Sequence, residues 1–279
     1  MNSLSVTSSF SVTSSFSVTY ECNGRFGNNV LQYLAAKLMS SKYNMRFFPA
    51  YTVPPQILQH QFQKVDDFEW IDMISGTKAP KSNILLNAYY QRAEVLYANR
   101  DLVKGFMDEN DIFNGQDIFA SIFKDVQVDP EVVVVHLRLD DFNFQNGSNV
   151  VDPQFFIEEI KATKKDKVVF IVDKMQRQNE LRYIKKIIDN CAGIKVKLQQ
   201  GSLLEDWNTL RCAPHVISSN SSYAWTACFF GKICNPSKQV VYPETSFYGH
   251  QNFSLVDENN NEVDGWKNVK VKTVDYMKF

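Results

Sequence analysis

The sequence predicts an α/β protein whose parallel strands alternate with helices, and three observations support this prediction. Residues 132–137 form a nearly continuous β-branched run, which is typical of a parallel strand buried on both faces. Strand-like and helix-like segments alternate from about residue 130 to about residue 245. Near the N-terminus, a strand, a glycine-containing turn and a helix follow one another over residues 17–40, as at the start of an α/β unit.

The N-terminal stretch contains a repeated hexapeptide, Ser-Val-Thr-Ser-Ser-Phe, at residues 5–10 and 11–16. Two short copies are too few to form a solenoid. We therefore expect a serine-rich extension that leads into a strand at residues 17–22. Apolar residues at helical spacing then predict a helix that ends near residue 40. Further strands are expected at residues 45–51 and 84–90.

The C-terminal half has clearer boundaries. Asp152 followed by Pro153 predicts a helix start, because Asp is a favoured N-cap and Pro fits the first helical position. The other expected strands are residues 167–172, 195–198, 215–218 and 240–242, and the other expected helices are residues 179–190, 202–210 and 223–230. From residue 252 the chain is polar, and we expect Trp266 to dock this tail.

Composition excludes several classes of protein. The 279 residues are 44% hydrophobic and 22% charged, which is ordinary for a globular protein of one or two domains. Because 30 basic residues balance 31 acidic ones, we expect no nucleic-acid partner. No apolar run is long enough for a membrane span, and no secretory leader is evident. We therefore expect a cytoplasmic enzyme, or a chain from which an anchor has been removed.

The cysteines predict neither a disulfide framework nor a zinc site. Their number, five, is odd, and no two have the CxxC spacing. We expect buried free thiols.

Three groups of polar and glycine residues lie at the carboxyl ends of predicted strands, where open α/β sheets bind ligands. The first is the turn at residues 24–29, in which Gly24 and Gly27 allow close approach of the backbone to a ligand. The following helix N-terminus favours an anion or a hydroxyl oxygen, and Asn28 offers both a donor and an acceptor. A plain structural turn remains open here.

The second group is His136 and Arg138, which alternate at the end of a buried strand and therefore point to the same side. The Arg138 guanidinium is suited to forked hydrogen bonds with a diphosphate. His136 would order Arg138 or touch the donor, or be purely structural. The neighbouring Asp140 and Asp141 would then pair with the arginine.

The third group is the Ser-rich turn at residues 218–223, where hydroxyls and backbone amides at a strand–helix junction suit a phosphate. An N-cap serine is the structural alternative.

Together these motifs resemble those of the α-1,2-fucosyltransferases and protein O-fucosyltransferases. Residues 24–29 are similar to their Gly-Arg-Leu/Phe-Gly-Asn-Gln motif, residues 136–138 to their His-x-Arg, and residues 205–225 to the segment that contains Asn-Ser-Ser/Thr-Phe-Ser-Trp. The resemblance implies a GT-B-like fold with two Rossmann-like domains that face a central cleft, and inverting transfer without a metal or other cofactor.

The same resemblance assigns roles to residues. Arg138 would bind the donor β-phosphate, Asn28 would lie near the reaction centre, and Ser221 and Ser222 would lie near the phosphates. The implied donor-binding set is Gly24, Arg25, Phe26, Gly27, His136, Arg138, Ser219, Asn220, Ser221, Ser222 and Tyr223. The implied partners are a nucleotide-sugar donor and a glycan acceptor.

Four parts of the chain are expected on this basis. They are an extension at residues 1–16, an acceptor-side Rossmann-like domain at 17–125, a donor-binding Rossmann-like domain at 126–250, and a tail at 251–279 that packs back on the fold.

The chain departs from the family pattern after His-x-Arg. The family usually continues with Arg, Gly and Asp, whereas this chain has Leu139, Asp140 and Asp141. The missing arginine removes one donor contact, so GDP-fucose is not the only candidate donor. The repeat and the lack of an anchor are also similar to enzymes of large DNA viruses, and a viral capsid-glycan xylosyltransferase would use UDP-xylose in the host cytoplasm.

The catalytic base is expected in the acidic segment at residues 66–72. The alternative interpretation is that this segment is simply a charged surface exposed to solvent. Asp72 is preferred because it follows an apolar Trp-Ile step, which suits a general base. The expected catalytic set is therefore Asp72, Arg138 and Asn28, and the other candidate bases are Asp66, Asp67, Glu69 and Asp141.

Two other functional classes remain open. One is a glycan-binding protein on an inactive transferase scaffold. The other is a sulfotransferase, although residues 24–29 lack the Lys-Ser/Thr of a phosphate-binding loop. A dehydrogenase is disfavoured because GxGxxG is absent.

Overall fold

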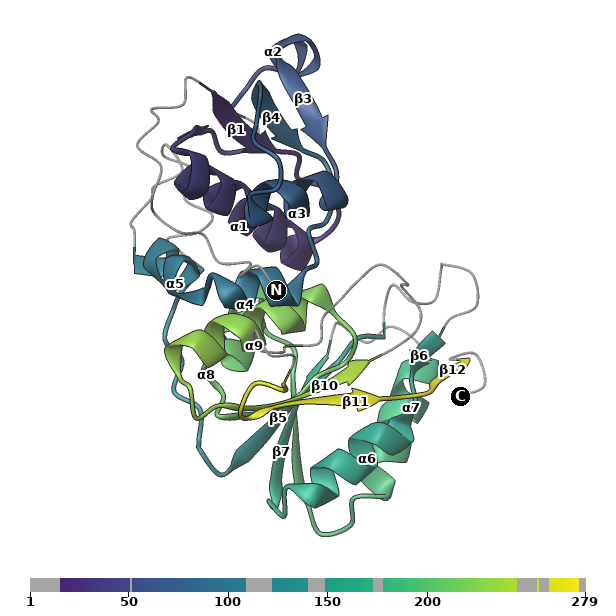
Figure 1. Cartoon of the computed structure of the whole chain (residues 1–279). Coiled ribbons are helices and arrows are strands. Elements are labelled where there is room, and N and C mark those ends of the chain that lie inside the picture. Colours follow the sequence, from purple (N-terminus) through teal and green to yellow (C-terminus); the bar gives the residue numbers. More distant parts are fainter. Residues whose placement is uncertain are drawn as a thin grey trace. The chain divides into compact units, whose positions relative to one another are not determined.

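The computed structural model describes residues 16–50, 52–108, 122–139, 149–172, 178–244, 255 and 261–275. The repeats of the N-terminal extension lie almost entirely outside these residues. The chain divides into two compact units, residues 1–121 with 251–261, and residues 122–250 with 262–279. Each unit contains its own parallel sheet and its own helices (Figure 1).

The sheet of the first unit has four parallel strands in the order β2-β1-β4-β3. Its strands are β1 (Ser17–Tyr20), β2 (Arg46–Phe47), β3 (Phe62–Val65) and β4 (Asn83–Leu86). Its helices are α1 (Phe26–Tyr43), α2 (Pro55–Gln61), α3 (Asp67–Ser75), α4 (Ala93–Ala98) and α5 (Arg100–Asp108).

The core of the first unit lies between its sheet and helices α1 and α3. Helix α1 buries Leu31, Leu34 and Leu38 almost completely, as their helical spacing predicted. The indole of Trp70 in α3 is fully buried and donates a hydrogen bond to the Ala35 carbonyl oxygen of α1, at 3.3 Å. The acidic segment is therefore a helix that is solvated on one side only.

The sheet of the second unit has six parallel strands in the order β11-β10-β9-β5-β7-β8. Its strands are β5 (Val132–Leu137), β7 (Lys167–Val172), β8 (Lys195–Gln199), β9 (His215–Ile217), β10 (Gln239–Glu244) and β11 (Trp266–Lys270). Two further strands, β6 (Asn149–Val151) and β12 (Thr273–Asp275), form an antiparallel pair. Numbered along the chain from β5, the six parallel strands have the 3-2-1-4-5-6 order of the Rossmann fold.

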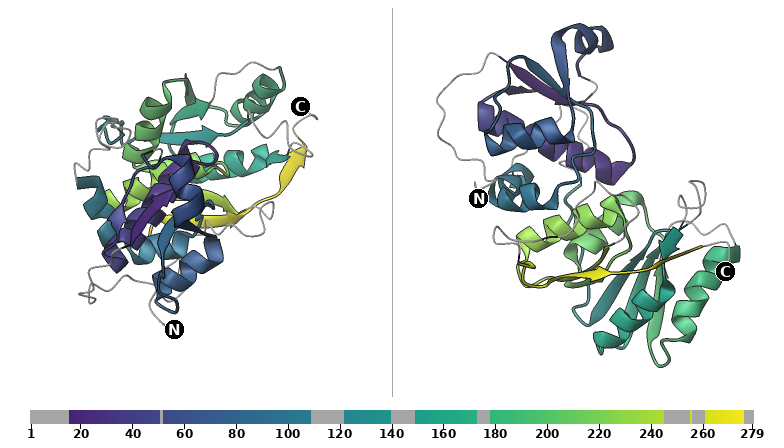
Figure 2. Two further views of the ribbon diagram at one scale, coloured as in Figure 1. Left: turned by 90° about the horizontal axis from the view of Figure 1, so that it is seen from above. Right: turned by 45° about the vertical axis from the view of Figure 1, so that its right-hand side comes forward.

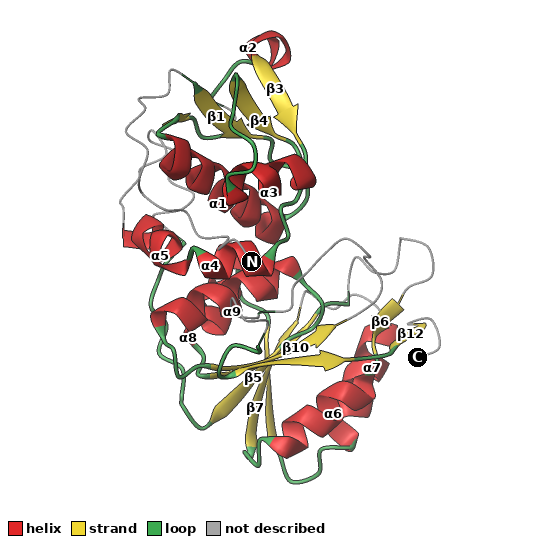
Figure 3. Ribbon diagram, viewed as in Figure 1, coloured by secondary structure: helices red, strands yellow, loops and turns green. Residues whose placement is uncertain are grey.

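Helices cover both faces of this second sheet. They are α6 (Pro153–Ala162), α7 (Gln178–Asp189), α8 (Leu203–Cys212) and α9 (Ser222–Cys234). Helices α6 and α7 pack together on one face, and α8 and α9 pack together on the other (Figure 3). The predicted α/β class, with a parallel sheet and helices in each of two units, is thus confirmed.

Local sequence signals explain where the helices of the second unit begin. The Asp152 carboxylate accepts a hydrogen bond from the Gln154 backbone N–H at 2.9 Å, and Pro153 is the first residue of α6. Ser202 and Glu205 form a reciprocal capping box at the start of α8. Every residue of β5 is buried, as expected of a central parallel strand.

The C-terminal tail adds a strand that the sequence analysis did not predict. Strand β11 pairs in parallel with β10 and forms the edge of the second sheet (Figure 2). Trp266 docks it, because its buried ring packs against Trp225 and Tyr242, with centroids 6.1 Å and 6.2 Å away.

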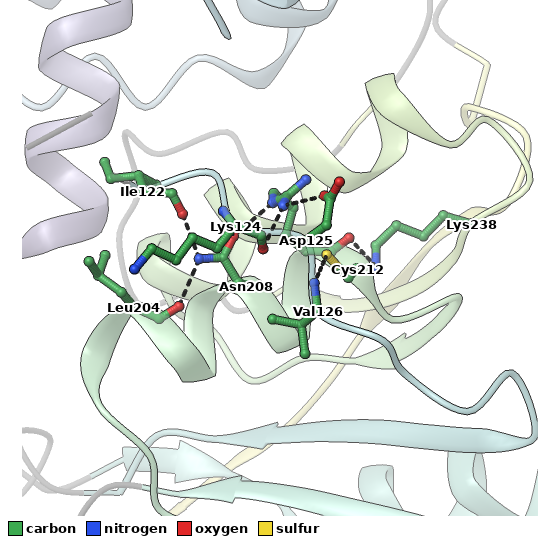
Figure 4. A network of polar contacts seen from close by, with 9 residues as sticks. Ile122, Lys124, Asp125, Val126, Leu204, Asn208, Cys212 and Lys238 are labelled. Atoms are coloured by element: carbon green, nitrogen blue, oxygen red, sulfur yellow. Dashed lines mark hydrogen bonds and ion pairs between the residues drawn. The ribbon is translucent and has the colours of Figure 1, made fainter. Parts of the chain in front are cut away.

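The chain enters the second unit through a segment that is held against α8. Asn208 donates hydrogen bonds to the carbonyl oxygens of Ile122 and Leu204, at 2.5 Å and 2.9 Å (Figure 4). Its amide oxygen accepts from the Lys124 backbone N–H at 3.2 Å. These contacts place residues 122–125 with the second unit, whereas the sequence analysis placed the boundary after residue 125.

All five cysteines are free thiols, but the expected burial is confirmed for only two of them. Cys191 and Cys228 are buried, whereas Cys234 is exposed. In the part of the chain that the structure describes, no helix has the length and apolar character needed to cross a membrane.

Candidate functional site

Along the chain, the strand order of the second sheet reverses direction once, between β5 and β9. In the first sheet, β1 and β4 are neighbours although they are not consecutive strands, and we call both places switch points. In open parallel sheets, ligands bind at such switch points, beyond the carboxyl ends of the strands. The candidate residues are found at these two places, one in each unit.

At the switch point of the second unit, a buried hydrogen bond joins the ends of β5 and β9. His136 Nδ1 and Ser219 Oγ lie 2.7 Å apart, and both residues are almost fully buried. The Tyr223 ring lies 5.7 Å from the His136 ring, and its hydroxyl donates to the Leu203 carbonyl oxygen at 2.6 Å. His136 therefore fixes the separation of the two strand ends.

Arg138 follows β5 directly and is half-buried. Its guanidinium is close enough to the phenol of Tyr242 in β10 to act on it electrostatically. Burial raises the pKa of Tyr242, and the Arg138 charge opposes this effect.

The Tyr242 hydroxyl, which lies near Arg138, is hydrogen-bonded to the serine-rich turn at residues 218–223. The phenol oxygen accepts from the Ser221 backbone N–H at 3.2 Å, and the hydroxyl donates to Asn220 Oδ1 at 3.3 Å. A fixed cation, a phenol and backbone amides thus converge at the start of α9.

Ser221 occupies the N-cap position of α9, but its hydroxyl makes no capping hydrogen bond. The structural alternative of a capping serine is therefore not what the structure shows. Ser222 and Tyr223 are the first two residues of the helix, with half-buried side chains. The N-terminus of α9, a helix of 13 residues, lies near the Arg138 guanidinium and therefore suits an anionic group such as a diphosphate.

At the switch point of the first unit, the glycine turn leads from β1 into α1. Gly24 has a φ of +81°, a conformation that L side chains rarely adopt. Arg25 is exposed at the N-cap position, and Phe26 and Gly27 are the first residues of α1. Asn28 Oδ1 accepts a hydrogen bond from Gln91 Nε2, at 2.8 Å.

Gln32 of α1 holds this turn against the loop that follows β4. It is fully buried; its Oε1 accepts from the Asn23 backbone N–H at 3.1 Å, and its Nε2 donates to the Ala88 carbonyl oxygen at 3.0 Å. Asn23 Nδ2 also donates to Asn87 Oδ1 at 3.0 Å. The turn at residues 24–29 is therefore part of a polar cluster that spans both loops.

The structure does not support Asp72 as a base beside Asn28. Asp72 is exposed near the C-terminal end of α3, and the carbonyl oxygen of its neighbour Met73 accepts from the Tyr43 hydroxyl at 2.6 Å. Tyr43 ends α1, whereas Asn28 lies in its first turn, so the two are roughly 22 Å apart along the helix axis. The preference for Asp72 rested on sequence neighbours alone, which do not reveal which end of a helix meets the site.

The other candidate bases have structural partners. Asp66 caps α3 by accepting from the Glu69 backbone N–H at 2.9 Å, and Glu69 is paired with Lys78. Asp67 is paired with Arg92 at 2.6 Å; burial raises its pKa, and the Arg92 charge opposes this effect. Asp140 and Asp141 lie outside the described residues.

Sequence reasoning missed Tyr242, Gln32 and Gln91, whose side chains organise the two switch points. Tyr242 was assigned only to a strand, and the two glutamines had no motif around them. A polar side chain inside an otherwise apolar helix face, as at Gln32, was the signal available.

Leu139, which stands where the family has a second arginine, is buried in the hydrophobic core of the second unit. This position therefore offers no cation to a donor. Among the described residues, no three His, Cys, Asp or Glu side chains gather as metal ligands would.

The sequence model of glycosyl transferase family 11 matches residues 72–235, more than half of the chain. This stretch contains Gln91, Arg138 and the serine turn, but not residues 24–29. No curated protein sequence matches the chain.

Two solved structures are similar at low identity. A point mutant of FUT1 of Arabidopsis thaliana in complex with GDP has 9% identity and a TM-score of 0.42, over 79% of this chain and 70% of its own. The dodecameric iron-containing heptosyltransferase TibC in complex with ADP-D-beta-D-heptose has 12% identity and a TM-score of 0.37, over 85% of this chain and 60% of its own. Both likenesses are too distant to carry any detail of function to this chain.

Proposed function

Because the chain belongs to glycosyl transferase family 11 and is thus a glycosyltransferase that uses a nucleotide sugar, we propose that it is an inverting, metal-independent enzyme that acts on a glycan hydroxyl. The observation that carries this proposal is the convergence of Arg138, Tyr242 and the N-terminus of α9 at the switch point of the second sheet. This arrangement suits a nucleoside diphosphate.

The reaction would be a single in-line displacement at the anomeric carbon. The acceptor oxygen forms a bond to that carbon while the bond to the diphosphate oxygen breaks and its electron pair leaves with the nucleotide. The acceptor proton passes to a base. Arg138 stabilises the charge that develops on the diphosphate, which is the role a magnesium ion would otherwise have.

The backbone N–H groups at the start of α9 add to this stabilisation. Ser221 is the N-cap and Ser222 the first residue of this helix. The Ser221 N–H already donates to the Tyr242 oxygen at 3.2 Å, so the N–H groups that follow it are the ones that face an anion. Because these dipoles are held before the substrate binds, they need no reorganisation during the reaction.

Two donors are candidates. GDP-fucose is favoured by the motifs at residues 24–29 and 136–138 and by the family match. UDP-xylose is the alternative, because the buried Leu139 replaces one arginine of the fucosyltransferase pattern and so weakens the case for GDP-fucose.

The test is turnover by the purified chain. GDP-fucose and UDP-xylose are incubated with a panel of p-nitrophenyl glycosides of galactose, glucose, xylose and fucose, with and without EDTA, and products are identified by mass spectrometry and proton NMR. We expect transfer from one donor that EDTA does not change, with inverted anomeric configuration.

Other outcomes identify the alternatives. Glycan binding without turnover of either donor would favour a binding protein, and turnover of the sulfate donor PAPS would favour a sulfotransferase. Transfer that EDTA abolishes would contradict metal independence.

A further inference from the structure

The loop after β4 makes a sharp turn that directs Gln91 inward. Tyr90 has a φ of +51°, which is unusual for an aromatic residue, and the Arg92 backbone N–H donates to the Tyr90 carbonyl oxygen at 2.9 Å. This bond closes a γ-turn centred on Gln91. The Tyr90 hydroxyl donates to the Val65 carbonyl oxygen at 2.5 Å, and its buried ring packs on Trp70. The conformation is thus held by the surrounding structure.

The Gln91 residue is buried, with a relative solvent exposure of 6%. Its Nε2 donates to Asn28 Oδ1 at 2.8 Å, whereas its own Oε1 is buried and accepts no hydrogen bond from the described residues. A buried polar side chain with an unsatisfied oxygen is costly to keep for packing alone, because an apolar residue of similar shape would avoid the loss. The polar group must therefore do something that an apolar residue would not.

The Gln91 bond decides which way the Asn28 carboxamide faces. Since Nε2 is a donor, Asn28 must present its oxygen to Gln91 and its amino group to the opposite side. That amino group lies over exposed Gly24: a Cβ added to Gly24 would be 2.6 Å from Asn28 Nδ2. Asn28 Nδ2 donates no hydrogen bond to any of the described residues, so it is available for a ligand oxygen.

We propose that Gln91 is a positioning residue for sugar transfer: it fixes the Asn28 carboxamide so that the amino group donates to a hydroxyl oxygen of the acceptor sugar. This inference rests on the proposed glycosyltransferase function. The group that Asn28 would bind is a sugar hydroxyl, because an uncharged amide recognises a hydroxyl oxygen with a single hydrogen bond.

Gln91→Glu tests the direction of the hydrogen bond. An ionised Glu cannot donate to Asn28 Oδ1, so the Asn28 amide turns over and presents its oxygen to the acceptor. A protonated Glu carries one O–H donor, and it restores the original arrangement. The charged groups beside the turn, Arg92 and Asp67, are already paired with each other at 2.6 Å, so burial governs the new carboxyl and raises its pKa.

The experiment compares the wild type, Gln91→Glu and the matched control Gln59→Glu, which makes the same change on exposed α2. Transfer to the p-nitrophenyl panel and hydrolysis of the donor are measured from pH 5.5 to pH 8. We expect Gln91→Glu to lose about 100-fold in transfer at pH 8. We also expect it to recover at least about tenfold, relative to wild type, as the pH falls. Donor hydrolysis and the control should follow the wild type.

A loss of transfer that is constant with pH, or no loss at all, would overturn the inference while leaving the proposed function intact. Wild-type chain that turns over no donor would overturn the proposed function and this inference with it. If Gln91→Glu does not fold, Gln91→Met replaces it. This variant should lose transfer at every pH with donor hydrolysis retained, and full transfer by it would overturn the inference.

Discussion

Gly24 combines a backbone conformation and a close neighbour that only glycine tolerates. Its φ is +81°, and a Cβ would lie 2.6 Å from Asn28 Nδ2. Gly193 has a similar φ of +85° but nothing within 4 Å of its Cβ position. The two residues therefore separate the effect of backbone strain from the effect on Asn28.

We expect Gly24→Ala to lose at least about tenfold in transfer, because the Asn28 amide must move to make room. Both Gly24→Ala and Gly193→Ala should lose about 1 kcal/mol in the free energy of unfolding, since alanine is strained at positive φ. Urea denaturation and transfer assays check the two effects. Equal transfer by both variants would show that the position of the Asn28 amide does not matter.

Asp72 was the base favoured by the sequence, and the structure leads to the opposite expectation. Because it is exposed at the far end of α1 from Asn28, Asp72→Ala should keep near-normal turnover. Its stability should change by less than about 0.5 kcal/mol, as for most surface substitutions. Steady-state kinetics check this, and a loss of turnover above about tenfold would restore Asp72 as a catalytic candidate.

The predictability of the site differed from residue to residue. His136 and Arg138 were identified because alternation along one strand shows which side chains share a face. Gln91 and Asn28 are 63 residues apart, and they meet only because β1 and β4 are neighbours in the sheet. Sequence spacing contains no information about that pairing.

At the scale of elements, helix α8 ends on an unusual cap. The ammonium group of Lys238, which is almost fully buried, donates to the carbonyl oxygens of Leu210 at 2.8 Å and Ala213, at the C-terminus of α8. Burial lowers the pKa of Lys238 to about 8. No acidic side chain is bonded to this ammonium group among the described residues.

This cap makes stability depend on pH. Between pH 8 and the ordinary lysine pKa of 10.5, the unfolded chain binds a proton that the folded chain does not, so the free energy of unfolding rises with pH. Compared with Lys238→Met, the wild type should gain about 1 kcal/mol between pH 7.5 and pH 9. Urea denaturation of both chains at these pH values measures the gain.

The comparison with Lys238→Met removes the contributions of other titrating groups, including the Cys228 thiol, whose pKa burial raises to about 11. A difference between the two chains that stays constant with pH would show that Lys238 keeps its proton throughout. The hydrogen bonds to the carbonyl oxygens of Leu210 and Ala213 would then stabilise the Lys238 ammonium charge more than burial destabilises it.

Elements with strong local signals were predicted, whereas two edge strands, β3 and β11, were not. Strand β5 is a run of buried β-branched residues, and α6 has both an N-cap and a first-turn proline. Strand β3 is mostly exposed, and β11 contains three polar residues among five, so neither resembles a buried strand. Their pairing with β4 and β10 makes them strands, and that pairing is a tertiary effect.

At the scale of the whole molecule, two units provide two separate switch points. The second unit places Arg138 beside a helix N-terminus, which suits a diphosphate. In the first unit the Asn28 and Gln91 amides, which suit sugar hydroxyls, lie in and beside the first turn of α1, where Arg25 is the exposed N-cap residue. The central claim is therefore that the second unit binds a nucleoside diphosphate through Arg138.

Thermal unfolding in the presence of GDP or UDP tests this claim most directly, because a ligand that binds only the folded chain raises the unfolding midpoint. The chains compared are the wild type, Arg138→Lys, which loses the forked hydrogen bonds, and Arg182→Lys, the same change on the exposed face of α7. We predict that one nucleotide raises the midpoint of the wild type and Arg182→Lys equally, and that Arg138→Lys loses most of this rise. An equal rise in Arg138→Lys, or no rise in the wild type with either nucleotide, would contradict the account.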